Sequence, residues 1–131
     1  MNMGDPGEVV IRMEKVEKTY AQGRLAVPAL RGIDLEVGRG EFAAICGPSG
    51  SGKTTLLNLV GALDLPTSGR ILLEGRDLGG MSRSRLSRLR RDRIGFVFQA
   101  YNLIPVLTAY ENAEMVLALK GVGRAGRRER V

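Results

Sequence analysis

The chain has 131 residues, of which 44% are hydrophobic and 26% charged, so its composition is that of one ordinary soluble domain. Its formal net charge is +6, and much of the positive charge lies in residues 83–93 and 120–131. No apolar run is long enough to span a membrane, and the N-terminus lacks the pattern of a secretory signal. The single cysteine, Cys46, excludes an intrachain disulfide, which favours a reducing compartment.

Apolar and polar residues alternate in the first two predicted elements, residues 8–20 (EVVIRMEKVEKTY) and 29–41 (ALRGIDLEVGRGE). Such alternation is typical of half-buried strands. We expect the two strands to form an antiparallel pair at the edge of a sheet, joined by the polar segment 21–28.

Three shorter apolar runs also predict strands. Residues 41–46 (EFAAIC) read as a central strand covered on both faces, residues 70–75 (RILLEG) as a strand that ends at a turn, and residues 93–99 (RIGFVFQ) as a buried strand. Apolar residues at helical spacing predict a helix over 53–62, between the first and second of these runs. Strands interleaved with helices favour an α/β fold around a mostly parallel sheet.

The second half of the chain predicts two more helices. Residues 82–91 place Leu86 and Leu89 on one side of an arginine-rich helix. Thr108 and Glu111 match a capping box that opens a helix at residues 109–120, after a loop that contains Pro105. Beyond Lys120 the periodic pattern is lost among glycine and arginine.

Residues 47–54 match the phosphate-binding pattern Gly-x-x-x-x-Gly-Lys-Thr in full, between a predicted strand and a predicted helix. Glycine lets successive backbone N–H groups approach phosphate oxygens closely, aided by the positive end of the following helix. A loop that only turns the chain would not need the full pattern in this context. The expected ligands of ATP are Gly47, Pro48, Ser49, Gly50, Ser51, Gly52, Lys53, Thr54 and Thr55.

Within this set, three side chains have distinct expected roles. Lys53 supplies a positive charge to the β- and γ-phosphates. The hydroxyl of Thr54 is placed to ligate Mg²⁺, and Thr55 can bond a neighbouring phosphate oxygen. The sequence therefore predicts a site for a nucleoside triphosphate with magnesium.

The residues around the loop resemble the ATP-binding cassette family, the ATPase subunits of ABC transporters. Residues 29–75 are similar to the first half of the cassette almost position by position. The run RIGFVFQ places Gln99 at the family's Q-loop glutamine, and KTY places Tyr20 where the family has an aromatic residue that stacks on adenine. The segments GALDLPTSG and IGFVFQAYNLIPVLTAYEN resemble most the subgroup of lipoprotein release and macrolide-type export. The resemblance covers nearly all of residues 9–131.

The resemblance implies an α/β fold with a P-loop NTPase core of the ABC type, an N-terminal antiparallel β-subdomain and the beginning of a helical subdomain. It implies that Tyr20 stacks on the base, that Lys53 and Gln99 act in catalysis, and that Thr54 and Gln99 ligate Mg²⁺. From the residues alone, Tyr20 could instead be a core or edge tyrosine and Gln99 a surface residue at a strand end.

The implied parts of residues 1–131 are a β-subdomain with the first core strand (9–46), the phosphate loop and its helix (47–62), a segment to the Q-loop (70–99) and the start of the helical subdomain (100–131). The implied partners are transmembrane permease subunits and a second ABC subunit. These partners imply a cytoplasmic chain attached to the inner face of the cell membrane.

The family's second half carries a Leu-Ser-Gly-Gly-Gln signature, an Asp-Glu pair and a switch histidine, and this chain has no histidine. Residues 77–82 (DLGGMS) fit the signature poorly and precede Gln99, so they predict a turn. We therefore expect a truncated cassette that binds ATP and hydrolyses it poorly, because positioning groups dominate phosphoryl transfer.

Two alternatives stay open. One is a non-catalytic or regulatory module that occupies the membrane partner through the Gln99 loop. The other is a nucleic-acid-binding module that uses the six arginines of residues 83–93. The few aromatic residues and the lack of a recognition module disfavour nucleic acid, and a solvated helix face explains the arginines equally well.

Overall fold

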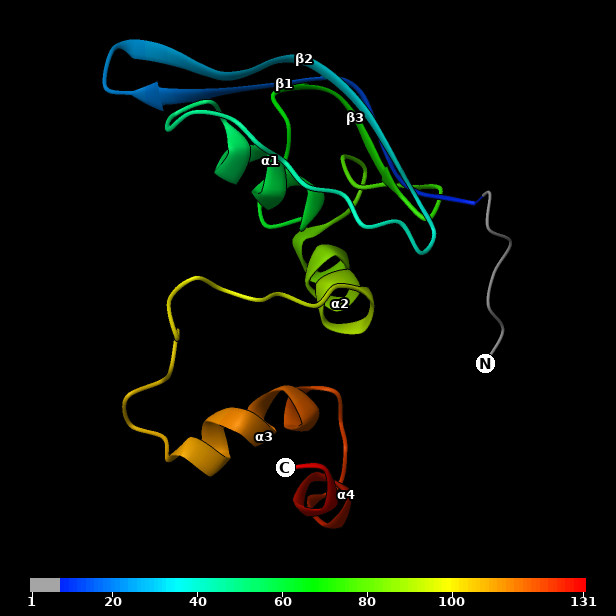
Figure 1. The fold of residues 1–131 in the computed structure, drawn as a ribbon, viewed down its shortest axis with the longest axis vertical. Helices are drawn as coiled ribbons and strands as arrows, with labels where there is room; N and C mark the ends of the chain where they lie inside the picture. Colours follow the sequence, from blue (N-terminus) through cyan, green and yellow to red (C-terminus); the bar gives the residue numbers. More distant parts are fainter. Residues whose placement is uncertain (1–7) are drawn as a thin grey trace. The chain divides into compact units, whose positions relative to one another are not determined.

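The computed structural model describes residues 8–131 and contains four strands and four helices in that range (Figure 1). The chain divides into two compact units at Leu86 and Ser87. The strands are β1 (Val9–Gln22), β2 (Leu25–Gly38), β3 (Ser68–Leu73) and β4 (Arg76–Asp77). The helices are α1 (Lys53–Val60), α2 (Arg83–Arg93), α3 (Ala109–Leu119) and α4 (Arg124–Arg130).

The strands form one sheet in the order β2-β1-β3-β4, and every neighbouring pair is antiparallel. The predicted antiparallel pairing of the first two strands is confirmed. The predicted connection over 21–28 is wrong, because both strands continue until Gln22 pairs with Leu25 and only Gly23 and Arg24 form the turn. A short hairpin turn lets the two strands pair along their full length, so the polar residues of the expected loop become strand residues. Of the two hairpin strands, β2 lies at an edge of the sheet and β1 does not, since β3 pairs with the other side of β1.

A bulge in β1 decides which of its side chains enter the core. Lys15 has a φ of 47°, and the pairing of β1 with β2 shifts register between Met13 and Val16. In a regular strand, residues three apart point to opposite faces, but an extra residue restores them to the same face. Met13 and Val16 are therefore both fully buried.

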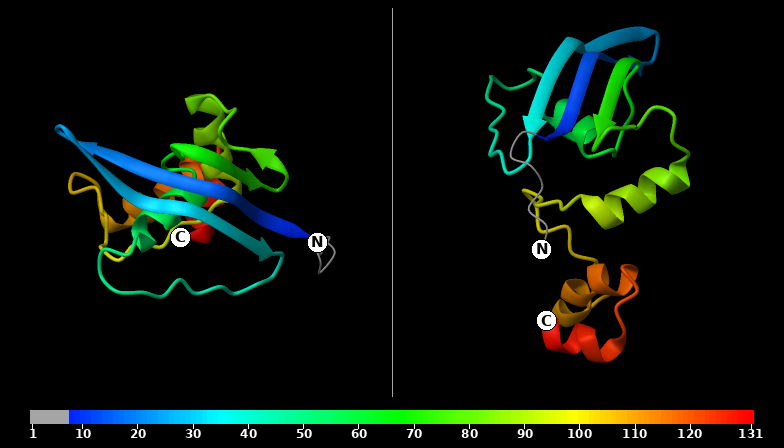
Figure 2. Two further views of the ribbon diagram at one scale, coloured as in Figure 1. Left: turned by 90° about the horizontal axis from the view of Figure 1, so that it is seen from above. Right: turned by 90° about the vertical axis from the view of Figure 1, so that its right-hand side faces the viewer.

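Helix α1 lies against one face of the sheet and closes the core of the first unit (Figures 1 and 2). The largest fully buried side chains come from β1, α1, β3 and the turn after β4, and each such aliphatic side chain contributes about 1.5–3 kcal/mol by leaving water. The helix ends at Val60 rather than at the predicted residue 62, because Gly61 caps it and Ala62 turns into the left-handed region. The buried set is Met13, Val16, Leu59, Ile71 and Leu78.

Two predicted strands do not form. Residues 41–46 and 94–98 have no regular structure, and Arg93 belongs to the end of α2. Phe42 is 96% exposed and Val97 is fully exposed. A central strand needs neighbours on both sides, and no strand of the described residues pairs with either segment. For the same reason the expected parallel sheet is wrong for residues 8–131, whose sheet is antiparallel throughout.

The strand predicted at 70–75 is confirmed with shifted ends as β3. Asp77 belongs to β4 rather than to the turn predicted over 77–82, and residues 78–82 lead into α2 as expected. Helix α2 buries Leu86 and Leu89 and exposes most of its arginines, so the expected amphipathic helix is confirmed. No described helix has the length and apolar character needed to cross a membrane.

The second unit contains α3 and α4. The capping box of α3 is present as predicted, with Thr108 accepting from the Glu111 N–H and Glu111 accepting from the Thr108 N–H. Helix α4 was not predicted, because RAGRRER has no apolar period. A part-buried ion pair ties it to α3, with 2.8 Å between Arg127 Nε and Glu114 Oε2, and Arg127 also donates to the Val122 carbonyl.

Candidate functional site

The phosphate loop is the irregular segment 47–52, which leads directly into α1 and runs outside the sheet (Figure 2). The Lys53 ammonium donates to the carbonyl oxygens of Gly47 at 2.9 Å and Pro48 at 2.6 Å, and it lies 3.5 Å from Ser51 Oγ. The loop therefore curls around the ammonium of the first residue of α1. This arrangement places one full positive charge beside the loop backbone.

Close packing of this loop requires a glycine at position 52 and leaves little room for a side chain at position 47. A Cβ on Gly52, whose φ is 90°, would stand 2.6 Å from the Ala29 carbonyl oxygen of β2. A Cβ on Gly47 would stand 2.8 Å from Ser51 Oγ. These glycines let the loop fold onto β2 and onto itself, a role that the motif alone did not reveal. A Cβ on Gly50 would meet nothing within 4 Å, so the space beside Gly50 is open.

The N-terminus of α1 is electrostatically suited to an anion. Its N-cap residue, Gly52, makes no side-chain cap hydrogen bond, and the first turn holds no acidic residue. The first N–H groups of a helix lack intrahelical partners and carry the positive end of the helix dipole. Phosphate oxygens are the acceptors that such a helix start binds.

The side-chain oxygens near the loop are compatible with a magnesium ion that is bound together with phosphate. Thr54 is exposed in the first turn of α1, and its hydroxyl is the kind of hard oxygen that Mg²⁺ prefers. The described residues contain no group of three or more histidine, cysteine, aspartate or glutamate side chains that could hold a metal. Mg²⁺ commonly completes its shell with substrate phosphates and water, so a single hydroxyl beside the loop is compatible with it.

Tyr20 lies within β1, as the strand predicted over residues 8–20 implies, and pairs with Val27 of β2. The residue is 38% exposed, and its hydroxyl donates to Asp64 Oδ2 at 3.1 Å. The Lys18 ammonium lies over the ring, 5.0 Å from the centroid. Tyr20 is therefore partly open to solvent, while its hydroxyl is hydrogen-bonded and the Lys18 ammonium lies over its ring.

Sequence reasoning missed Lys18 and Asp64, which contact Tyr20. Lys18 Nζ donates to Asp64 Oδ1 and to the Leu65 carbonyl, each at 2.7 Å. The only available signal was local: Lys18 stands two residues before Tyr20, a spacing that favours one face of a strand. Asp64 lies 46 residues after Lys18 in the chain, and no sequence pattern links it to β1.

Asp64 is held in its ionised form by these contacts. Partial burial acts to raise its pKa, but hydrogen bonds from Lys18, the Leu65 N–H and Tyr20 outweigh burial, so the pKa of Asp64 lies below its usual value. The carboxylate therefore keeps both oxygens as acceptors at neutral pH.

Gln99 is exposed in the irregular segment that follows α2. It belongs to the second unit, whereas Tyr20 and the phosphate loop belong to the first. The proximity of Gln99 to the phosphate loop therefore stays a prediction.

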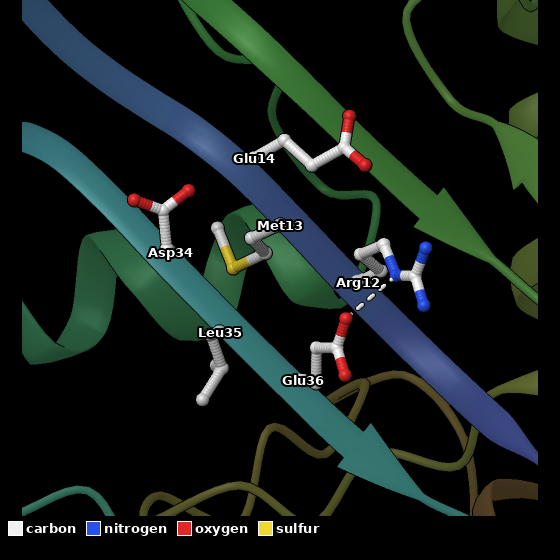
Figure 3. Close-up of a pocket in the computed structure, with 6 residues that line it drawn as sticks. All are labelled: Arg12, Met13, Glu14, Asp34, Leu35 and Glu36. Atoms are coloured by element: carbon white, nitrogen blue, oxygen red, sulfur yellow. Dashed lines mark ion pairs between the residues drawn. The ribbon is translucent and has the colours of Figure 1, made fainter.

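A separate pocket of about 370 Å³ lies between β1 and β2 (Figure 3). Its carboxylates already have partners: Glu36 pairs with Arg12 at 2.8 Å, Glu14 with Arg70 at 3.7 Å, and Asp34 accepts from the Lys15 N–H at 2.8 Å. These pairings satisfy the acidic groups within the chain, so the pocket is not a candidate ligand site. It is lined by Arg12, Met13, Glu14, Asp34, Leu35 and Glu36.

Comparison with known proteins gives consistent matches. The family model for the ABC transporter matches residues 30–131. The macrolide export ATP-binding/permease protein MacB of Brucella abortus is 51% identical over 95% of this chain and 19% of its own length. The lipoprotein-releasing system ATP-binding protein LolD of Xanthomonas campestris is 46% identical over 89% of this chain and 49% of its own length. These relatives confirm the expected resemblance to the export and lipoprotein-release subgroup.

A solved structure agrees. The ATP-binding cassette MJ0796, from Methanocaldococcus jannaschii, was solved as a dimer in a post-hydrolysis state bound to ADP and Pi. It matches 92% of this chain and 53% of its own with a TM-score of 0.85 and 44% identity. The expected ABC-type α/β fold class is thereby confirmed, with its antiparallel β-subdomain present in residues 8–131. The chain spans about half the length of LolD and MJ0796. With a family model over most of its length, the chain belongs to the ABC transporter ATPase family.

Proposed function

We propose that residues 47–55 bind the triphosphate of ATP together with Mg²⁺. The observation that carries this proposal is the Lys53 ammonium, which donates to the carbonyls of Gly47 and Pro48 at a helix start that has no side-chain cap. Backbone N–H groups of the loop and of α1 supply donors for the phosphate oxygens, and Lys53 adds a full charge. The family relationship supports the same ligand.

The other proposed site residues bind the base, the magnesium ion and the γ-phosphate. The exposed part of the Tyr20 ring stacks on the base, which needs no hydrogen-bond match. Thr54 and Gln99 hold Mg²⁺ through a hydroxyl and an amide oxygen, and Lys53 and Gln99 stabilise and orient the reacting γ-phosphate. The magnesium ion, when bound, neutralises charge that develops on the phosphate oxygens.

In the complete protein, we propose that ATP hydrolysis powers export through transmembrane permease subunits. The names of MacB and LolD support this role, since one is a macrolide export ATP-binding/permease protein and the other belongs to a lipoprotein-releasing system. The dimeric structure of MJ0796 supports pairing with a second ABC subunit. Such an assembly implies a cytoplasmic location on the inner face of the membrane.

We further propose that residues 1–131 correspond to the N-terminal half of a cassette, divided as 9–46, 47–62, 70–99 and 100–131. The lengths of LolD and MJ0796 support this assignment. Residues 1–131 contain no histidine and no apolar run ending in Asp-Glu, so we expect this stretch alone to bind ATP and hydrolyse it slowly.

No observation favours the regulatory or nucleic-acid alternatives. Helix α2 buries its two leucines and points most of its arginines to solvent, as an ordinary amphipathic surface helix does.

Calorimetric titration of residues 1–131 with Mg-ATP tests the proposal. We expect Lys53→Ala to weaken binding at least tenfold, because the charge beside the phosphates is lost, which corresponds to about 1.4 kcal/mol. Lys120→Ala removes the same charge from the exposed C-cap of α3 and should leave binding unchanged. Equal binding by wild type and Lys53→Ala would refute the proposed site.

A further inference from the structure

A polar cluster joins β1 to the connection between α1 and β3. The two oxygens of Asp64, in that connection, each accept from a different side chain of β1. Oδ1 accepts from Lys18 Nζ at 2.7 Å and Oδ2 accepts from the Tyr20 hydroxyl at 3.1 Å. One carboxylate therefore fixes both a cation and an aromatic ring.

The ring of Tyr20 is held at two points. Its hydroxyl is fixed by Asp64, and the Lys18 ammonium lies over the ring at 5.0 Å from the centroid. The Lys18 side chain is only 12% exposed and is itself anchored by Asp64 and by the Leu65 carbonyl. The ring consequently has one preferred orientation while 38% of the residue stays open to solvent.

The backbone around Asp64 is also fixed. Thr67 N–H donates to the Glu17 carbonyl at 2.9 Å, and Thr19 N–H donates to Thr67 Oγ1 at 3.0 Å. On its other side, the Asp64 N–H lies 3.3 Å from the carbonyl of Asn58 in α1. Asp64 therefore links the Tyr20 ring to the helix whose first turn carries the phosphate loop.

We infer that Lys18 and Asp64 are positioning residues that hold the Tyr20 ring ready for the base and so favour a nucleoside triphosphate over a bare triphosphate. The inference rests on the proposed binding of ATP at residues 47–55. A ring that is already oriented loses less conformational freedom when a base stacks on it, so more of the stacking free energy appears as affinity.

Asp64→Asn tests this inference with two probes, Mg-ATP and magnesium tripolyphosphate, titrated into residues 1–131. Asparagine keeps the size but loses the negative charge that holds the Lys18 ammonium, and its amide N–H can only donate to the Tyr20 hydroxyl, so the hydrogen bond with Tyr20 must reverse its direction. We expect ATP affinity to fall about three- to tenfold, a part of the stacking free energy, while tripolyphosphate affinity changes less than about twofold.

The matched control is Glu36→Gln. It breaks the 2.8 Å ion pair of Glu36 with Arg12, which is another β1 residue. Glu36 lies opposite Arg12 in the hairpin, whereas Tyr20 lies opposite Val27. Neither affinity should change. Tyr20→Phe provides a second variant that removes only the hydroxyl: it should lower ATP affinity selectively, and combining it with Asp64→Asn should add less than about twofold.

An unchanged ATP affinity in Asp64→Asn and Tyr20→Phe would overturn the inference. Equal losses for both probes would also overturn it, because they would mean that Asp64 acts on the fold or the phosphate loop. These failures leave wild-type binding of ATP intact. If the wild type binds neither probe, the proposed function fails, and the inference fails with it.

Discussion

The hairpin of β1 and β2 and the segment at residues 41–46 are both rich in apolar side chains, yet only the hairpin forms strands. In the hairpin, pairing begins at the Gly23–Arg24 turn, so each strand finds its neighbour within a few residues. Residues 41–46 have no strand beside them among the described residues, and Phe42 is almost fully exposed. The difference shows that an apolar run becomes a strand only when a partner supplies its hydrogen bonds.

The same contrast separates the contributions of buried and exposed apolar groups to stability. The core under the sheet joins Met13, Ile71 and Leu59 across elements distant in the sequence. The apolar residues of 41–46 and 94–98 contribute little to the stability of the unit to which each belongs, because most of them stay in contact with water.

Replacing one apolar side chain in the core and one in residues 41–46 tests this difference most directly. Leu59→Ala leaves a cavity between α1 and the sheet, so we expect a loss of about 2–5 kcal/mol in the free energy of unfolding. Phe42→Ala removes a larger but exposed side chain and should change the free energy by no more than about 0.5 kcal/mol. Urea denaturation followed by circular dichroism measures both. Comparable losses would mean that residues 41–46 are packed in solution.

The predictable parts of the molecule are those specified by neighbouring residues. The hairpin strands, α1 and the capped start of α3 follow from alternation, helical spacing and a four-residue box. The phosphate loop was predictable because its chemistry demands a fixed order of residues. The surroundings of Tyr20 were not, because Asp64 reaches β1 across a long stretch of chain.

Elements that depend on tertiary partners were predicted wrongly or missed. The strands expected at 41–46 and 93–99 require neighbours that periodicity cannot supply. The bulge at Lys15 changes which β1 residues face the core, and no composition rule identifies it. Helix α4 has no buried residue, and the contact that joins it to α3 is the Arg127–Glu114 ion pair, which no sequence period indicates.

In the second unit, helix α3 is stabilised by its N-terminal cap rather than by a buried core, so removing the cap should have a smaller effect than Leu59→Ala. Helix α3 has no buried residue, whereas α1 buries Leu59 and has no side-chain cap, so the capping box contributes a large share of the stability of α3. Thr108→Ala removes the acceptor of the Glu111 N–H and should cost about 1 kcal/mol of local stability. Amide hydrogen exchange in α3 measures the loss. Ser87→Ala, at an exposed position within α2, is the control and should leave α3 exchange unaltered.

The weakest expected effect concerns the other half of the capping box. Hydrogen bonds from the Thr108 N–H and hydroxyl to Glu111 hold the pKa of this carboxyl below its ordinary value. Because the folded pKa is the lower one, the unfolded chain takes up the proton first, and the contribution of Glu111 is present above the unfolded pKa. It should be lost as the pH falls below about 4 and through the folded pKa. Amide exchange of α3, corrected for the intrinsic effect of pH and measured at pH 7 and pH 3, should therefore show a loss of protection in the wild type that is smaller in Glu111→Gln. The same pH dependence in both proteins would mean that the Glu111 carboxylate does not stabilise α3. The stability of this helix would then have to come from interactions outside its first turn.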